Sequence, residues 1–366
     1  MKKKTKEPRS KAGLEFRPDV AIPPGATLQE TMESLGWSQK ELAERTELTV
    51  MSLNRIFKGE QPISYETAGR LELVTGVPAR FWNNLEANYR EQLARLAERS
   101  RLEEDLDWLE TMPTAELIRR GAIEAADDAV DLLRQVLSFF GVSSVAAWKA
   151  LWANPAVAAR RSTCFETRLA AAATWIRLGE REAADIECRP FRKQAFHDTL
   201  DEVRGLTRED PDQAFPRLQE MCAACGVAVA FVPEFPKVPW NGATKWLTPD
   251  KAMILLNLRG KAEDRLWFSF CHEAGHVLHD GKKELFINAG PSDDEREKAA
   301  DQFASNLLIP HRYHDRIREA HTPADIRDLA DEIGVGPGIV AGRYQFLTSR
   351  WAAFKDLIRP LAWHPA

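Results

Sequence analysis

The sequence predicts an α+β protein that is mainly helical, with a small sheet in its C-terminal half. Three observations predict this class. Segments with helix-capping signals follow one another in residues 25–96, apolar side chains recur at helical spacing in residues 97–220, and strand-like apolar runs flank turns in residues 226–257. We therefore expect a basic, disordered arm at 1–24, a helical domain at 25–96, a helical middle region at 97–220, a mixed domain at 221–320 and a helical tail at 321–366.

Capping residues delimit the N-terminal helical domain. Ser38, with Glu41 three residues later, forms a capping box, and Thr49 is a second N-cap. Gly36 and Gly59 stop helices, because glycine adopts the left-handed conformation without strain. These signals predict helices at 27–35, 41–46, 49–57, 64–74 and 78–96.

The middle region and the tail show helical periodicity without a chemical motif. We expect the middle region to space the two functional ends of the chain or to serve as a multimerisation surface, with its tryptophans as core anchors. The pattern predicts helices at 105–119, 124–140, 145–153, 167–178 and 191–203, and two short helices joined by a glycine-rich turn within 325–344.

Composition argues against membrane insertion and secretion. The chain has 366 residues, 44% of them hydrophobic, and a net charge of −5. It lacks an apolar run of about 18 residues, and its basic N-terminus lacks an apolar core, so neither a membrane span nor a signal peptide is predicted. Five cysteines, an odd number, fit a reducing compartment. We expect a cytoplasmic protein without a membrane partner, and Cys222 and Cys225 as packing residues at a helix end.

An HExxH pentad lies within a predicted helix at 264–279. Its two histidines, His272 and His276, lie four residues apart, which places both imidazoles on one helix face about 6 Å apart along the axis. Two such imidazoles can bind one tetrahedral zinc ion. Glu273 then borders the open coordination position, where it can accept a proton from water and pass it to a leaving amine. The pentad therefore predicts a catalytic zinc site.

A catalytic zinc ion needs a third protein ligand. Glu297 begins a second predicted helix at 295–308, and Asp301 lies one turn further on the same face. We expect Glu297 to be the ligand and Asp301 to bond a ligand imidazole from the outer shell. His279 also lies on the ligand face but about 10.5 Å along the axis from His272, which favours an outer-shell or helix-end role.

Two strands around a turn precede the pentad, at 241–247 and 252–257. Peptidases can hold an extended substrate by adding it to a sheet edge, so the first of these strands is the candidate for peptide binding. An ordinary core hairpin is the alternative. The candidate substrate-strand residues are Gly242, Ala243, Thr244, Lys245 and Trp246.

The residues around the pentad resemble the ImmA/IrrE family of zinc metallopeptidases. His272 to His276 read His-Glu-Ala-Gly-His, and the stretch opened by Glu297 reads Glu-Lys-Ala-Ala-Asp-Gln-Phe-Ala-Ser-Asn-Leu-Leu-Ile-Pro. The resemblance implies a gluzincin-like metallopeptidase domain with His272, His276 and Glu297 on zinc and Glu273 as the base. It also implies a protein substrate, typically a helix-turn-helix repressor. Many members carry a histidine four residues after the second ligand, where this chain has Asp280.

The N-terminal helices resemble the helix-turn-helix of HigA-type antitoxins and related repressors. Residues 37–43, 59–64 and 81–85 carry the resemblance, which covers about residues 25–92. In such a domain the third helix enters the major groove of double-stranded DNA. The candidate DNA-binding residues are Gln39, Lys40, Thr49, Ser52, Asn54, Arg55 and Lys58.

Charge gives a mixed indication about DNA. Residues 27–76 hold eight glutamates against five lysines and arginines, whereas a phosphate-binding surface should be basic. A basic arm could compensate by following the phosphate backbone. The first eleven residues of this arm carry Lys2, Lys3, Lys4, Lys6, Arg9 and Lys11 against Glu7. The alternative is a helix-turn-helix fold used for dimerisation or for recognition of a substrate repressor.

Together these features predict a zinc-dependent endopeptidase of the HExxH and distant Glu type, coupled to a DNA-binding module. We expect stress-triggered cleavage of a repressor or antitoxin. Self-cleavage is an alternative, because the peptidase and helix-turn-helix modules lie in the same chain. The competing hypothesis is an antitoxin-like transcriptional regulator that keeps zinc for structure or sensing. A third is a scaffold that binds a toxin protein. A homodimer is compatible with each hypothesis.

Overall fold

The computed structural model describes residues 20–152, 169–236, 238–281, 285–288 and 295–363. The chain divides into two compact units, Met1–Leu106 and Asp107–Ala366. Residues 1–19, which contain every lysine and arginine of the predicted basic arm, lie outside the described residues.

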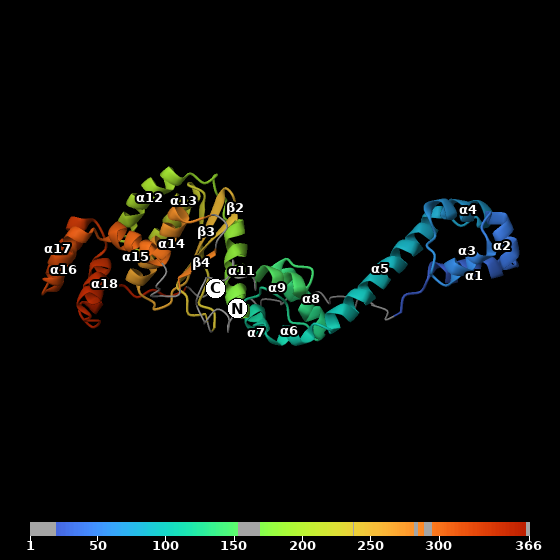
Figure 1. Ribbon diagram of the computed structural model, residues 1–366, viewed down its shortest axis with the longest axis horizontal. Coiled ribbons are helices and arrows are strands. Elements are labelled where there is room, and N and C mark those ends of the chain that lie inside the picture. Colours follow the sequence, from blue (N-terminus) through green and yellow to red (C-terminus); the bar gives the residue numbers. More distant parts are fainter. Residues whose placement is uncertain (1–19, 153–168, 237, 282–284, 289–294, 364–366) are drawn as a thin grey trace, which may run out of the picture. The chain divides into compact units, whose positions relative to one another are not determined.

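Helices make up the described part of the first unit (Figure 1). They enclose a core of aliphatic side chains, Met32 and one buried tryptophan, Trp82. Ser38 accepts a hydrogen bond from the Glu41 backbone N–H at 3.2 Å, but the Glu41 carboxylate binds Arg45 at 2.8 Å, so the predicted capping box is only half formed. The helices are α1 (Pro24–Ser34), α2 (Gln39–Thr46), α3 (Val50–Phe57), α4 (Tyr65–Thr75) and α5 (Ala79–Glu103).

The second unit begins with four short helices. The helix predicted at 105–119 is two helices, because Pro113 lacks the backbone N–H that a continuous helix needs. The helix predicted from residue 124 starts only at Ala129, where the Asp128 side chain accepts hydrogen bonds from the first turn. The four are α6 (Leu106–Glu110), α7 (Thr114–Arg119), α8 (Ala129–Phe140) and α9 (Val145–Trp152).

The segment Ala129–Trp152 has the length and hydropathy of a membrane span. In the structure it is two helices, because Gly141 adopts a φ of 68° and ends α8. At about 1.5 Å per residue, neither helix reaches the roughly 30 Å of a bilayer core. Phe140 packs against Trp148 and Trp152 at ring-centroid distances of 5.7 and 5.9 Å. The segment is thus a pair of helices that share an aromatic core.

A four-stranded sheet with the order β1-β3-β2-β4 lies at the centre of the second unit. β1 runs parallel to β3, whereas β2 runs antiparallel to both of its neighbours. The predicted α+β class is therefore confirmed. The strands are β1 (Val227–Phe231), β2 (Gly242–Thr248), β3 (Lys251–Leu256) and β4 (Leu285–Asn288).

Helices cover both faces of this sheet (Figure 1). On one face lies α11 (Leu169–Asp185), whose Gly179 has no Cβ and so lets Leu255 of β3 approach closely. On the other face, one core joins the sheet to four helices, the last two of which carry the functional site. Those helices are α12 (Lys193–Leu206), α13 (Pro211–Ala223), α14 (Glu263–His279) and α15 (Glu295–Leu308).

The middle region and the tail both pack onto this unit. The Arg120 guanidinium after α7 donates hydrogen bonds to the carbonyls of Pro233 and Glu234 at 3.1 and 2.8 Å. In the tail, Arg359 binds the buried carboxylate of Glu263 at the start of α14. The tail comprises η1 (His311–Tyr313), α16 (His314–Arg318), α17 (Pro323–Ile333), α18 (Pro337–Thr348) and η2 (Lys355–Leu357).

Candidate metal centre

The HExxH residues lie in the buried half of α14. Glu263 and Asp264 in its first turn complement the helix dipole, and apolar residues at helical spacing hold the helix against the sheet. His272, Glu273 and His276 are 2%, 0% and 1% exposed. Polar side chains buried this completely need partners, so their surroundings define what the site can do.

Close packing of α14 against α15 brings the predicted third ligand to the pentad. Gly275 of α14 faces α15, and a Cβ atom at this position would lie 3.2 Å from the Phe303 ring and 3.4 Å from the Ala300 Cα. The small residues at this crossing let the two helices approach closely. Glu297, in the first turn of α15, consequently reaches both imidazoles.

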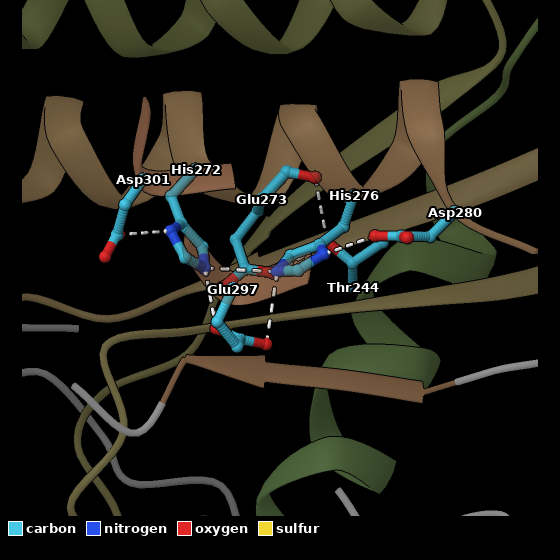
Figure 2. A network of polar contacts seen from close by, with 7 residues as sticks. All are labelled: Thr244, His272, Glu273, His276, Asp280, Glu297 and Asp301. Carbon is cyan, nitrogen blue, oxygen red and sulfur yellow. Dashed lines mark hydrogen bonds and ion pairs between the residues drawn. The ribbon is translucent and has the colours of Figure 1, made fainter. Parts of the chain in front are cut away.

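Three electron-pair donors converge at the centre of the site (Figure 2). The His272 and His276 Nε2 atoms lie 3.1 Å apart. The Glu297 carboxylate oxygens lie 3.2 Å from His272 Nε2 and 3.4 Å from His276 Nε2. Within the described part of the chain, this is the one group of three such side chains whose donor atoms all lie within 4.8 Å of one another.

A carboxylate binds the outward nitrogen of each imidazole. The Asp301 Oδ1 atom lies 2.8 Å from His272 Nδ1, and the Asp280 Oδ2 atom lies 2.6 Å from His276 Nδ1. These contacts favour a proton on each Nδ1 and leave both Nε2 lone pairs facing the centre, together with the Glu297 carboxylate. Three such acceptors repel one another unless a cation lies between them.

The donor set fits zinc. Tetrahedral zinc with ligand bonds of about 2.0–2.1 Å separates its donor atoms by roughly 3.3 Å, close to the separations among these three residues. Two imidazoles and one carboxylate are a ligand set of catalytic zinc sites, which keep a fourth position open. The residues present could therefore hold such an ion.

The charges of these groups are coupled. Burial disfavours a charged imidazole, but hydrogen bonds to carboxylates outweigh it and raise the pKa of His272 to about 10 and that of His276 to about 9. Burial opposes ionisation of Glu297, yet its contacts with His272 and His276 lower its pKa to about 2. The centre thus attracts positive charge strongly, whether protons or a metal ion.

Glu273 lies beside the centre on α14 and faces β2. Burial raises the pKa of its carboxyl group, while His272, His276 and a hydrogen bond from Thr244 oppose that rise. The Thr244 hydroxyl donates to Glu273 Oε2 at 2.7 Å (Figure 2). The other carboxylate oxygen, Oε1, is buried and has no hydrogen-bond partner among the described residues. A carboxyl group in this environment can both accept and return a proton.

The structure gives Asp280, not His279, the outer-shell position at His276. The His279 ring packs against the Phe303 ring at 5.4 Å and makes no described contact with the three central residues. Asp280 lies four residues after His276, so one helical turn brings its carboxylate to the imidazole. This spacing could have identified Asp280 in the sequence.

The predicted substrate strand does not lie at the sheet edge. Residues Gly242 to Lys245 of β2 pair with β3 on one side and with β4 on the other. The residues of β4 lie between the two ligand-bearing helices in sequence and give no alternation long enough to predict a strand. Of the predicted set, Thr244 and Gly242 face Glu273, Lys245 instead forms an ion pair with Glu180, and Trp246 packs against Phe191. Ala243 is fully buried.

Three of the predicted DNA-binding residues are engaged within the first unit. Gln39 donates to the Val50 carbonyl at 3.3 Å. The Thr49 hydroxyl caps α3 by accepting from the Ser52 N–H at 3.0 Å. The Ser52 hydroxyl in turn accepts from Gln61 at 2.7 Å. These three side chains support the turn between α2 and α3.

The other four predicted DNA-binding residues are exposed. Lys40 forms an exposed ion pair with Glu44 at 3.9 Å. Asn54, Arg55 and Lys58 lie on the exposed face of α3 and its C-terminal end. The exposed face of α3 therefore leaves Asn54, Arg55 and Lys58 accessible to another macromolecule.

Comparison with known families identifies both modules. Residues 232–344 match the family model described as the IrrE N-terminal-like domain, a peptidase family, and residues 28–82 match the helix-turn-helix family model. No curated protein matches the chain. The first match contains His272, Glu273, His276 and Glu297, and the second contains α2 and α3. Residues 232–344 are therefore similar to the IrrE N-terminal-like peptidase domain, and residues 28–82 are similar to a helix-turn-helix domain.

Proposed function

We propose that the second unit is a zinc-dependent endopeptidase that cleaves a helix-turn-helix repressor or an antitoxin-like protein. The observation that carries this proposal is the convergence of His272, His276 and Glu297 beside the buried carboxylate of Glu273. A zinc site used for structure alone would not need a buried carboxyl group with a partnerless oxygen next to it. The family match supports the peptidase assignment.

Each residue has a separate role in this proposal. His272, His276 and Glu297 would hold the zinc ion, which when bound supplies a Lewis acid for the scissile carbonyl. Glu273 accepts a proton from the attacking water and gives it to the leaving amine. Asp280 and Asp301 orient the two imidazoles through their Nδ1 atoms.

The strand arrangement suggests how a peptide substrate would approach. The outer edge of β1 is blocked, since Gln219 donates to the Val229 carbonyl and Glu182 accepts from the Phe231 N–H, both at 2.9 Å. β4 covers β2 at the opposite side of the sheet. An extended substrate that adds to the sheet would therefore pair with β4, or with β2 after β4 moves.

We also propose that the first unit binds double-stranded DNA through α3. Asn54 can bond base edges, and Arg55 and Lys58 can bind phosphates. The helix-turn-helix match supports this assignment. Removal of residues 1–11 should weaken salt-dependent binding if the basic arm follows the backbone, and unchanged affinity would refute a role for the arm.

The experiment for the peptidase proposal is co-expression. Wild-type and Glu273→Gln proteins are each produced with repressors and toxin partners encoded nearby, under normal and DNA-damaging conditions, and intact masses are measured. A fragment that forms only with the wild type would establish proteolysis and identify the substrate. Fragments with neither protein, when zinc is bound, would favour a regulator that keeps zinc without proteolysis.

A further inference from the structure

Two residues of β2 contact the carboxyl group of Glu273. The Thr244 side chain is 1% exposed, and its hydroxyl lies 2.7 Å from Glu273 Oε2 and 3.1 Å from the Glu273 backbone carbonyl (Figure 2). A hydroxyl carries one proton and can donate one strong hydrogen bond. The shorter contact goes to the carboxylate, where a charge-assisted bond is stronger than one to a carbonyl.

Gly242 limits where this carboxyl group can move. A Cβ atom at this position would lie 2.7 Å from Glu273 Oε1 and 2.8 Å from Glu273 Cγ. The space beside the carboxyl side chain is therefore too small for a Cβ atom, and any side chain larger than hydrogen would push it away. Gly242 is needed here for space, since its backbone conformation is one that other residues also adopt.

The two oxygens of Glu273 consequently differ. Oε2 is held by Thr244, whereas Oε1 is buried and has no partner among the described residues. A buried carboxylate oxygen without a hydrogen bond costs free energy, and a catalytic role is one explanation for its presence in a folded protein. Oε1 is thus the oxygen that is free to receive a proton.

We propose that Thr244 and Gly242 are positioning residues that hold Glu273 so that Oε1 serves as its proton-accepting atom. This inference rests on the proposed peptidase function. In the reaction, the water oxygen bonds to the scissile carbonyl carbon while its proton moves to Oε1. As the carbon–nitrogen bond breaks, Oε1 returns that proton to the departing nitrogen, which leaves as the amine.

A binding assay tests the inference without a peptide substrate. Acetohydroxamic acid binds a metal ion as its anion, and a nearby base that takes up its acidic proton strengthens this binding. Its affinity for the cobalt-loaded full-length protein, followed by the visible absorption of cobalt, therefore reports whether Glu273 is in position. Metal content is measured for every variant, so that loss of metal is not mistaken for loss of the base.

Thr244→Val should weaken acetohydroxamate binding about tenfold or more, the usual consequence of losing a hydrogen bond to a buried charged group, with metal content unchanged. Thr244→Ser should restore affinity to within about threefold, because it keeps the hydroxyl. Thr248→Val is the matched control. It removes an exposed hydroxyl on the same strand that binds Asp250, and it should not change affinity.

Gly242→Ala provides a second test should Thr244→Val fail to fold. It should lower affinity by displacing Glu273 while the metal stays bound. Wild-type affinity in both Thr244→Val and Gly242→Ala, or equal weakening in Thr244→Val and Thr244→Ser, would overturn the positioning role. Metal-loaded wild-type protein that does not bind acetohydroxamate would overturn the peptidase function as well, because it would lack an open coordination position.

Discussion

The metal centre and the exposed face of α3 are built in opposite ways. At the metal centre, buried side chains hold one another, and each imidazole is fixed between two carboxylates. On α3, Asn54, Arg55 and Lys58 extend from an exposed helix face. Burial forces polar groups into defined partnerships, whereas solvent satisfies exposed groups in any arrangement. The chemistry of the first region can therefore be inferred from its geometry, and that of the second depends on a partner.

The largest expected effect is the loss of metal when a ligand is removed. His276→Ala and Glu297→Ala should each abolish stoichiometric zinc binding, because two remaining donors do not make a closed site. His279→Ala, on the same helix, should bind zinc like the wild type, since His279 packs against Phe303. Zinc content after equilibrium dialysis measures this. Equal loss in all three variants would indicate general unfolding of α14.

The second effect separates binding from chemistry. Glu273→Gln should retain zinc but lower the hydrolysis rate by about 10²–10⁴-fold, the usual contribution of a general base. The rate is measured on the substrate found by co-expression. Hydrolysis at the wild-type rate would mean that another group activates water.

Zinc affinity should depend steeply on pH. Without metal, hydrogen bonds to the surrounding carboxylates raise the pKa of both imidazoles, so protons compete for the site. Zinc must displace these protons, and its affinity should therefore rise as the pH increases from 6 to 8. Competition with a chelator at several pH values measures this dependence. A pH-independent affinity would contradict the coupled charges described for the centre.

Replacing either carboxylate that bonds a ligand imidazole should weaken zinc binding less than removing a ligand. The two replacements should also differ from each other in size. Asp280→Asn should weaken zinc binding about 10–100-fold, because the amide no longer attracts the imidazole proton as strongly. The Asp280 side chain is 11% exposed and that of Asp301 is 50% exposed, so solvent already screens Asp301 and Asp301→Asn should cost less. Chelator competition at one pH compares the two. A larger loss of zinc affinity in Asp301→Asn than in Asp280→Asn would show that solvent exposure does not set the strength of these contacts.

The smallest effects concern α3. Arg55→Ala and Lys58→Ala should each reduce the slope of log affinity against log salt concentration by about 1, which corresponds to the loss of one phosphate contact. Arg95→Ala, which removes an exposed arginine paired with Glu91 on α5, is the control and should leave this dependence unchanged. Fluorescence anisotropy over a salt series measures the slope. Equal slopes in all proteins would show that Arg55 and Lys58 do not contact phosphates, and no DNA binding by the wild type would favour protein recognition by this unit.

Residue type and spacing are enough to predict the central residues of the metal site. His272 and His276 must share a helix face, and α15 carries Glu297 and Asp301 one turn apart. The contribution of β2 cannot be predicted in this way, because contacts of Thr244 and Gly242 with Glu273 depend on how the sheet packs under α14. The role of Asp280 was not predicted, although its spacing of four residues from His276 is visible in the sequence.

The sheet and the helix boundaries show the same limit. The apolar runs that form β1, β2 and β3 are visible in the sequence, whereas β4 has only four residues and acquires its role by pairing with β2. Pro113 and Asp128 set helix boundaries through local chemistry that could be read more strictly from the sequence. The pairing of strands across the sheet depends on long-range packing and could not be predicted from the sequence.

Zinc stoichiometry in four proteins tests the central claim most directly. Wild-type, Glu273→Gln, Glu297→Ala and His279→Ala proteins are dialysed against zinc, and bound metal per chain is measured by mass spectrometry. We expect one ion in the wild type, Glu273→Gln and His279→Ala, and none in Glu297→Ala. Zinc retained by Glu297→Ala but lost from His279→Ala would contradict the assigned metal centre.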